Sequence, residues 1–144
     1  MKGLLGMINV RTGRIFLDSI KLETLLFGFD KVFVVFRGQL SRSLLDSYTV
    51  QKVLKVSEEL HKLEDTEESS LEDSLKVYDV YSIDYNIITR VELKKNLIPY
   101  RIKIKIKTDQ TEFEWTVDPL PGETDLYDRC LSVLQSAFPD KFSS

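Results

Sequence analysis

The feature that most constrains the fold is a strict alternation of isoleucine with basic residues over residues 101–107. The three isoleucines fall on one face of an extended chain and the basic residues fall on the other. A two-residue period with β-branched side chains on one face is typical of a strand that is buried on one side. Residues 112–117 repeat the pattern, with Phe113, Trp115 and Val117 on one face. Two half-buried neighbouring strands are therefore predicted.

These two strands are predicted to form a hairpin around Asp109 and Gln110. With a two-residue turn there, each apolar residue lies opposite another apolar residue, whereas a shift by one position would oppose every isoleucine to a polar residue. The predicted pairs are Lys107–Glu112, Ile106–Phe113, Lys105–Glu114, Ile104–Trp115, Ile102–Val117 and Arg101–Asp118. Three cations then face three acids, so the outer face of the hairpin is expected to carry locally balanced charge.

One further strand and a helix complete this part of the chain. Residues 83–95 precede the hairpin and are predicted to be a single strand. The last helix is expected to be capped by Thr124 or Asp125 and to stop at Pro139. Its apolar residues recur at helical spacing, and they are Tyr127, Cys130, Leu131, Leu134 and Phe138. This face is expected to pack on the sheet.

The amino-terminal part gives weaker strand signals. A turn is expected at Thr12-Gly13, and short strands are expected at residues 14–18 and 21–26, followed by a turn at residues 27–30. Residues 32–36 read Val-Phe-Val-Val-Phe, the most hydrophobic run in the chain. Such a run predicts a central strand that is covered on both faces or lies inside a curled sheet. Gly38 is expected to end it.

The middle of the chain changes to a helical period. A helix is predicted over residues 44–64, although residues 50–56 are β-branched enough to form a strand instead. Residues 64–70 are the most polar stretch and are expected to form a mobile loop, with an acidic interaction site as the alternative. Ser70 is then expected to cap a short helix over residues 71–78, whose apolar side chains are Leu71, Leu75 and Tyr78.

Length and composition limit the class of protein. The chain has 144 residues, which predicts one domain over residues 1–144, and its net charge of −3 argues against a nucleic-acid binder. No apolar run approaches the roughly 20 residues that a membrane span needs. The single cysteine, Cys130, has no partner for an internal disulfide, and a cytoplasmic location is expected.

The sequence contains no recognisable catalytic or cofactor-binding motif. It has no Gly-rich phosphate loop and no CxxC, HExxH or GxSxG string, so no enzyme activity and no cofactor or metal are expected. His61 is the only histidine and is predicted to be a surface residue of the mid-chain helix. Cys130 lies on the apolar face of the last helix and is predicted to be a small buried hydrophobe without thiol reactivity.

One group of basic residues forms a candidate binding surface. The residues that could bind an anionic ligand or a membrane surface are Lys94, Lys95, Arg101, Lys103 and Lys105. The competing interpretation is a solvated sheet face, because the predicted register places acids opposite several of these cations. This second interpretation is favoured, and protein–protein contact is preferred to contact with a membrane.

The carboxy-terminal part of the chain, residues 82–141, resembles pleckstrin homology-like domains of the small prokaryotic and GRAM-like type. The resemblance is carried by SIDYNIITRVELKK, RIKIKIKT, EFEWTV and LYDRCLSVLQSAF. It implies an α+β fold, with a curled antiparallel sheet or PH-like barrel, a C-terminal capping helix and a helical insertion at about 44–78. It also implies a non-enzymatic module for protein–protein contact or self-association, with an unidentified partner. The basic motif that binds phosphoinositides in many such domains is absent near residues 18–21.

Overall fold

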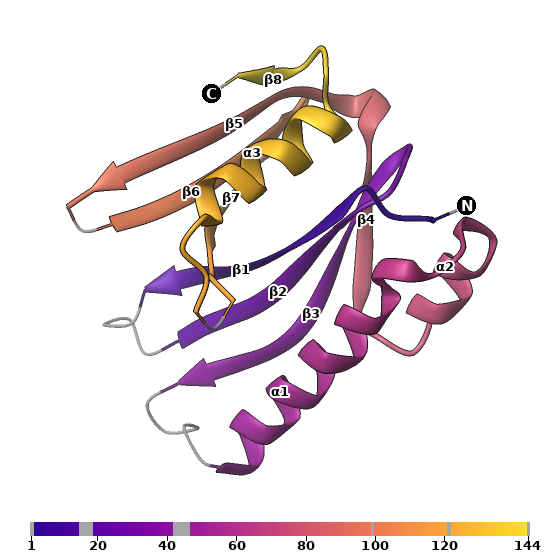
Figure 1. The fold of residues 1–144 in the computed structure, drawn as a ribbon, viewed down its shortest axis with the longest axis vertical. Helices are drawn as coiled ribbons and strands as arrows, with labels where there is room; N and C mark the ends of the chain where they lie inside the picture. The colour runs from indigo at the N-terminus through magenta and orange to yellow at the C-terminus, as the bar shows by residue number, and fades with distance from the viewer. Residues whose placement is uncertain (1, 15–18, 42–46, 99, 121, 144) are drawn as a thin grey trace.

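The described part of the chain forms one sheet and three α-helices (Figure 1). The computed structural model describes residues 2–14, 19–41, 47–98, 100–120 and 122–143. The strands are β1 (Gly6–Arg14), β2 (Ser19–Phe27), β3 (Lys31–Ser41), β4 (Val80–Asp84), β5 (Ile88–Leu97), β6 (Tyr100–Thr108), β7 (Glu112–Val117) and β8 (Phe142–Ser143). The helices are α1 (Ser47–His61), α2 (Glu68–Leu75) and α3 (Leu126–Ala137), and 3₁₀ turns occupy Lys62–Asp65 and Tyr85–Ile87.

The sheet is open and its strand order is β4-β3-β2-β1-β7-β6-β5-β8. Neighbouring strands are antiparallel except β5 and β8, which are parallel. The α+β class is confirmed, with a mid-chain helix and a C-terminal helix packing on the sheet. The expectation of a curled antiparallel sheet or PH-like barrel is wrong. Among the described strands, β4 pairs only with β3, while β5 pairs with β6 and β8, so the two ends of the sheet do not join.

The strands β2 and β3 are covered on both faces over much of their length. Val32 and Val34 of β3 point into a core that α3 closes, whereas Phe33 and Val35 point into a second core that α1 and α2 close. We call these the α3-side core and the α1-side core. The prediction that residues 32–36 form a strand covered on both faces is therefore confirmed, because successive residues of a strand point to opposite faces.

Two glycines that suggested strand ends lie inside strands instead. The predicted turn at Thr12-Gly13 is wrong, because β1 continues to Arg14 and Gly13 pairs with Ile20. The predicted end at Gly38 is also wrong, since β3 continues to Ser41 after a bulge. A Cβ at Gly38 would lie 2.5 Å from Cγ2 of Val53, so this glycine permits the close approach of α1. Residues 15–18, which belong to a predicted strand, lie outside the described residues.

The mid-chain helices differ from prediction in their limits. The helix predicted over 44–64 is α1, and the strand alternative for residues 50–56 is wrong. Residues 42–46 lie outside the described part. The predicted loop at 64–70 is largely ordered secondary structure, because a 3₁₀ turn, a bridge from Glu67 to Lys2 and the start of α2 occupy it. The amide of Gly3 also donates to the carbonyl of Thr66 at 2.8 Å.

Helix α2 begins before its predicted cap. Its N-cap residue is Glu67, and Ser70 lies in the first turn, where its amide donates to the carbonyl of Glu67 at 3.0 Å. Leu71 and Leu75 are buried in the α1-side core and Tyr78 packs against it, as the spacing predicts. The burial of this apolar face determines the position of the helix more strongly than a serine cap does.

The strand predicted over residues 83–95 is two strands. A 3₁₀ turn separates β4 from β5 and sends them to distant positions in the sheet. Tyr85 lies in this turn, its ring centroid 4.6 Å from that of Phe138, and its hydroxyl donates to the carbonyl of Gly28 at 2.6 Å. These tertiary contacts hold the chain in a turn that the local sequence pattern does not reveal.

The predicted hairpin register is confirmed from Lys107–Glu112 to Ile104–Trp115. Ile102, Ile104 and Ile106 are buried, and so are Trp115 and Val117. The predicted pair Arg101–Asp118 lies beyond the paired residues of β6 and β7, and the carboxylate of Asp118 accepts from Arg11 of β1 at 2.9 Å. The buried face of the last helix is rotated relative to the predicted one. Tyr127 and Leu131 are only half-buried, and the fully buried residues are Leu126, Cys130, Leu134 and Ala137.

Candidate functional site

Metal-ligating side chains do not come together in the described part of the chain. There, no cluster of three or more His, Cys, Asp or Glu side chains could hold a metal ion. His61 is exposed on α1, as predicted, with Nδ1 3.5 Å from a carboxylate oxygen of Glu64. Cys130 is fully buried, as predicted, and burial raises the pKa of its thiol to about 11. A thiol with that pKa is protonated at neutral pH and is a poor nucleophile.

Three of the five predicted basic residues lie on the outer face of the sheet with acidic neighbours. Nζ of Lys103 is 3.3 Å from Glu114, and Nζ of Lys105 is 3.3 Å from Glu112 and 3.5 Å from Glu114. Lys94 of β5 lies 3.7 Å from Glu92. The hydrogen bond that Lys105 donates to Glu112 is the main reason that the pKa of Lys105 is raised. This part of the surface has mixed charge, as the hairpin register predicts.

The other two predicted basic residues are separate from that group. Lys95 lies opposite Ile102, and its Nζ is 5.2 Å from the ring centroid of Tyr127 on α3 and 5.8 Å from that of Tyr100. Arg101 is exposed and lines a pocket of about 320 Å³ beside Arg11. In the ranges that the structure describes, neither Lys95 nor Arg101 has an acidic partner within ion-pair distance. The five residues therefore do not form one binding surface.

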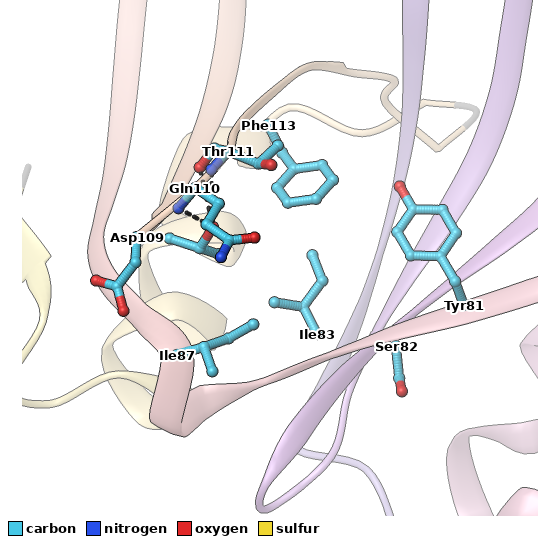
Figure 2. Close-up of a pocket in the computed structure, with 9 residues that line it drawn as sticks. Tyr81, Ser82, Ile83, Ile87, Asp109, Gln110, Thr111 and Phe113 are labelled. Atoms are coloured by element: carbon cyan, nitrogen blue, oxygen red, sulfur yellow. Dashed lines mark hydrogen bonds between the residues drawn. The ribbon is translucent and has the colours of Figure 1, made fainter.

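A different feature, an open pocket of about 340 Å³, lies between β4 and the β6–β7 turn. Figure 2 shows Ile83 and Ile87 pointing toward the same space as the rings of Tyr81 and Phe113. Thr108, Gln110 and Thr111 form its rim, and the hydroxyl of Thr108 accepts from the amides of both other residues. The pocket combines apolar walls with a polar rim that has only one charged residue, Asp109, as is typical of a site for an apolar side chain.

The pocket borders an unpaired edge of the sheet. At the two ends of the β3–β4 pair, the amide of Phe36 donates to the carbonyl of Asp79 and the amide of Tyr85 donates to the carbonyl of Asp30, each at 2.9 Å. Because bonded residues alternate in an antiparallel pair, Ser82 directs its backbone N–H and C=O away from β3. No strand in the described ranges pairs with this side of β4. Its backbone groups are therefore free to bind another extended segment.

The wall of the pocket is supported by stacked rings and a buried carboxylate. The ring centroids of Tyr81 and Phe113 are 6.2 Å apart, and those of Phe113 and Trp115 are 5.5 Å apart. Nε1 of Trp115 donates to Oε1 of the buried Glu23 at 3.3 Å. Burial, together with the charge of Glu23, raises the pKa of Tyr81 to about 12. The wall is thus held by rings from β4 and β7.

Behind this wall, Arg37 joins three strands and α1. It donates to the carbonyl of Glu23 at 3.0 and 3.2 Å, to the carbonyl of Val10 at 3.3 Å and to the hydroxyl of Ser57 at 3.1 Å. Burial lowers the pKa of its guanidinium, against the opposing influence of Asp118 and Glu23. These polar residues fix the neighbouring strands but do not line the pocket.

The pocket was not predicted from the sequence. It is formed by segments that are distant in sequence, and no local sequence pattern indicates that they lie close together. Tyr81 and Phe113 come from strands that are not neighbours in the sheet. A signal that the sequence did contain is two large apolar residues, Tyr81 and Ile87, close to the break between two strands. Within the described residues, no helix is both long enough and apolar enough to cross a bilayer. Comparison of the chain with protein-family models, curated proteins and solved structures finds no match.

Proposed function

We propose that this chain is a non-enzymatic binding module that takes an extended segment of another protein onto the free edge of β4. The observation that carries the proposal is the coincidence of that edge with the apolar pocket beside it. In strand-addition recognition, backbone hydrogen bonds supply affinity and a side-chain pocket supplies specificity. Residues 81–83 of β4 contribute both to the free edge and to the wall of the pocket.

The chemistry of the pocket favours an uncharged, apolar side chain of the bound segment. Tyr81, Ile83, Ile87 and Phe113 supply the apolar contact area, and the polar groups of the β6–β7 turn can bond to the backbone of the segment. Ile87 is 50% exposed, so covering it removes apolar surface from water. A short edge strand with such a pocket is suited to a selective partner and not to general aggregation.

Replacing Ser82 tests the backbone part of the proposal. Ser82→Pro removes an outward-facing N–H, while proline is tolerated at strand edges, so the β3–β4 pairing is retained. Ser82→Ala keeps the N–H and is the matched control. Linear peptides selected from a displayed random library on the unmodified protein should bind Ser82→Pro about tenfold more weakly, as expected for one lost hydrogen bond. Equal affinity for the proline and alanine variants would contradict strand addition.

Replacing Ile87 tests the pocket. Ile87→Ser removes an apolar wall and should weaken the same peptides about tenfold. Leu54→Ser is the control, because Leu54 is also 50% exposed but lies on α1. Selection of no peptide, or of peptides unaffected by Ile87→Ser, would refute the proposed site. If sedimentation equilibrium shows a dimer that Ser82→Pro dissociates, the bound segment comes from a second copy of the chain.

A relationship to pleckstrin homology-like domains is part of the same proposal. Seven strands followed by a helix that packs on the sheet agree with it. The open sheet and the parallel strand β8 differ from the closed barrel of that family. The proposed binding mode depends on the edge of β4 and does not require the relationship.

A further inference from the structure

The tip of the β5–β6 hairpin exposes large apolar side chains to solvent. Leu97 is 71% exposed, Ile98 is 95% exposed and Tyr100 is 55% exposed. In Figure 1 this tip lies at the far end of the two strands, away from α1 and α2. These side chains contribute little hydrophobic stabilisation to the fold, because most of their surface stays in water. It is suited to burial against something outside the chain.

The charge around the tip is strongly segregated. Residues 94–103 contain four cations, Lys94, Lys95, Arg101 and Lys103, and no acid. The chain as a whole carries −3, so the remaining residues together carry −7. Glu92 and Glu114 offset part of the segment's positive charge beside Lys94 and Lys103, and the remaining positive charge lies nearer the tip, at Lys95 and Arg101.

The fold also places like charges opposite each other there. Lys94 pairs directly with Lys103 across β5 and β6, an arrangement that is unfavourable in an isolated sheet. Their acidic partners, Glu92 and Glu114, lie toward the body of the sheet. Lys95 and Arg101 lie closer to the tip, and no described residue of the hairpin between Lys94 and Lys103 has a carboxylate that could pair with them. An external anionic surface would offset this repulsion.

We propose that the β5–β6 tip docks on the surface of an anionic lipid bilayer, with Leu97 and Ile98 inserted among the headgroups and acyl chains. Tyr100 places a ring with a polar hydroxyl beside them, the type of side chain that favours the membrane interface. Lys94, Lys95 and Arg101 lie on the flanking strands, where long basic side chains reach lipid phosphates. The tip protrudes and does not form a groove, so its binding partner must be deformable or must offer a cavity. A lipid bilayer is deformable.

This proposal uses a different part of the protein from the peptide site. The tip involves β5 and β6 at the turn between them, whereas the β4 pocket uses the opposite turn of β6, toward β7. The variants Ser82→Pro and Ile87→Ser should therefore leave vesicle binding unchanged. Failure of one proposal leaves the other standing.

Vesicle sedimentation provides the first test. The protein should bind vesicles of phosphatidylcholine mixed with phosphatidylserine and should not bind phosphatidylcholine alone. Each cation near an anionic leaflet strengthens binding about fivefold, so Lys94→Gln with Arg101→Gln should weaken it roughly 30-fold. The matched control, Lys52→Gln with Lys55→Gln, makes the same charge change at exposed positions of α1 and should have little effect. Equal losses of vesicle affinity in both double variants would show that only the net charge of the protein matters, which would overturn the proposal.

The apolar contribution is tested separately. Ile98→Ser should weaken binding to the anionic vesicles about tenfold. Val77→Ser is the control, because Val77 is 82% exposed and lies outside the hairpin. Unchanged affinity of Ile98→Ser would show that nothing inserts, which contradicts the proposal even if charge attraction persists.

Insertion is observed directly with a polarity-sensitive dye. Ile98→Cys can be labelled selectively, because Cys130 is buried, and its fluorescence should shift to the blue on anionic vesicles. The same dye at Val77→Cys should not shift. If both dyes shift equally, or if polyglutamate binds the tip as well as vesicles do, the surface recognises acidic chains in general and the bilayer proposal is wrong.

Discussion

Nε1 of Trp115 donates a hydrogen bond to Oε1 of Glu23 across 3.3 Å, although 92 residues separate the two in the chain. Both side chains are buried in the α3-side core region, and Nζ of Lys21 is 3.7 Å from the other oxygen of the carboxylate. This bond connects β2 with β7, which β1 separates in the sheet. A buried carboxylate needs such donors, because an unsatisfied charge in a protein interior is costly.

Trp115→Phe should lower the free energy of unfolding by about 1–3 kcal/mol, because it keeps most of the ring and removes the N–H that reaches Glu23. Urea denaturation followed by circular dichroism measures the loss. Val117→Ala is a useful reference for the removal of apolar volume alone on the same strand. A loss below about 0.5 kcal/mol for Trp115→Phe would mean that the hydrogen bond contributes nothing to stability.

The same pair of residues shows what the sequence could predict. The register of Trp115 against Ile104 follows from alternation and a short turn, both of which are local. The partner of its indole nitrogen does not follow, since Glu23 reads as an ordinary surface acid in a strand of uncertain limits. Likewise, Tyr85 ends β4 through contacts with Gly28 and Phe138, which lie far away in sequence. Local periodicity predicted the hairpin and the helices, whereas the pocket depends on the tertiary placement of β4 beside the β6–β7 turn.

Gly38→Ala should destabilise the protein by about 1–3 kcal/mol, because the new methyl group would meet Val53 of α1 at 2.5 Å. Removing the obstacle gives a sharper test. In the double variant Gly38→Ala with Val53→Ala, the loss in unfolding free energy should be smaller than the sum of the two single-variant losses by about 0.5–3 kcal/mol. Thermal or urea unfolding of the two single variants and the double variant measures this coupling. Strict additivity would show that α1 moves away from β3 without resistance.

Acid should weaken the contact between α3 and the loop before it. Arg129 donates to Glu123 at 2.5 and 3.1 Å, and this hydrogen bonding lowers the pKa of the Glu123 carboxyl below its ordinary value of 4.5. A carboxyl with a lowered pKa stabilises the fold above its unfolded-state pKa, and that contribution is lost as the pH falls through the folded-state pKa. Arg129→Gln should therefore show a smaller loss of stability below pH 4.5 than the unmodified protein, as measured by urea unfolding across the acid range. Parallel profiles would contradict the assignment.

At alkaline pH, the ionisation of Tyr81 should destabilise the fold as the pH rises, whereas the protonation of Glu123 does so as the pH falls. Its folded-state pKa is about 12 against an ordinary value of 10.0, mainly because of burial. The neutral phenol is therefore favoured in the folded state, and its contribution is lost as the pH rises from about 10 to 12. Tyr81→Phe should lose less stability across this window, and its tyrosinate absorbance should lack a component that ionises near pH 12. If the variant instead lacks a component that ionises near the ordinary value of 10.0, Tyr81 lies in water.

The narrow junction between β1 and β7 has a consequence for folding kinetics. Its described pairs are Val10–Val117 and Arg11–Thr116, extended by the bond from the amide of Asp118 to the carbonyl of Asn9. On either side, β1–β2–β3 and β5–β6–β7 are joined by short connections and can form from neighbouring segments. Arg11 and Asp118, by contrast, are 107 residues apart, so their meeting requires the closure of a very long loop. We expect the docking of two early-formed meanders at this junction to be the slow step that sets the folding rate.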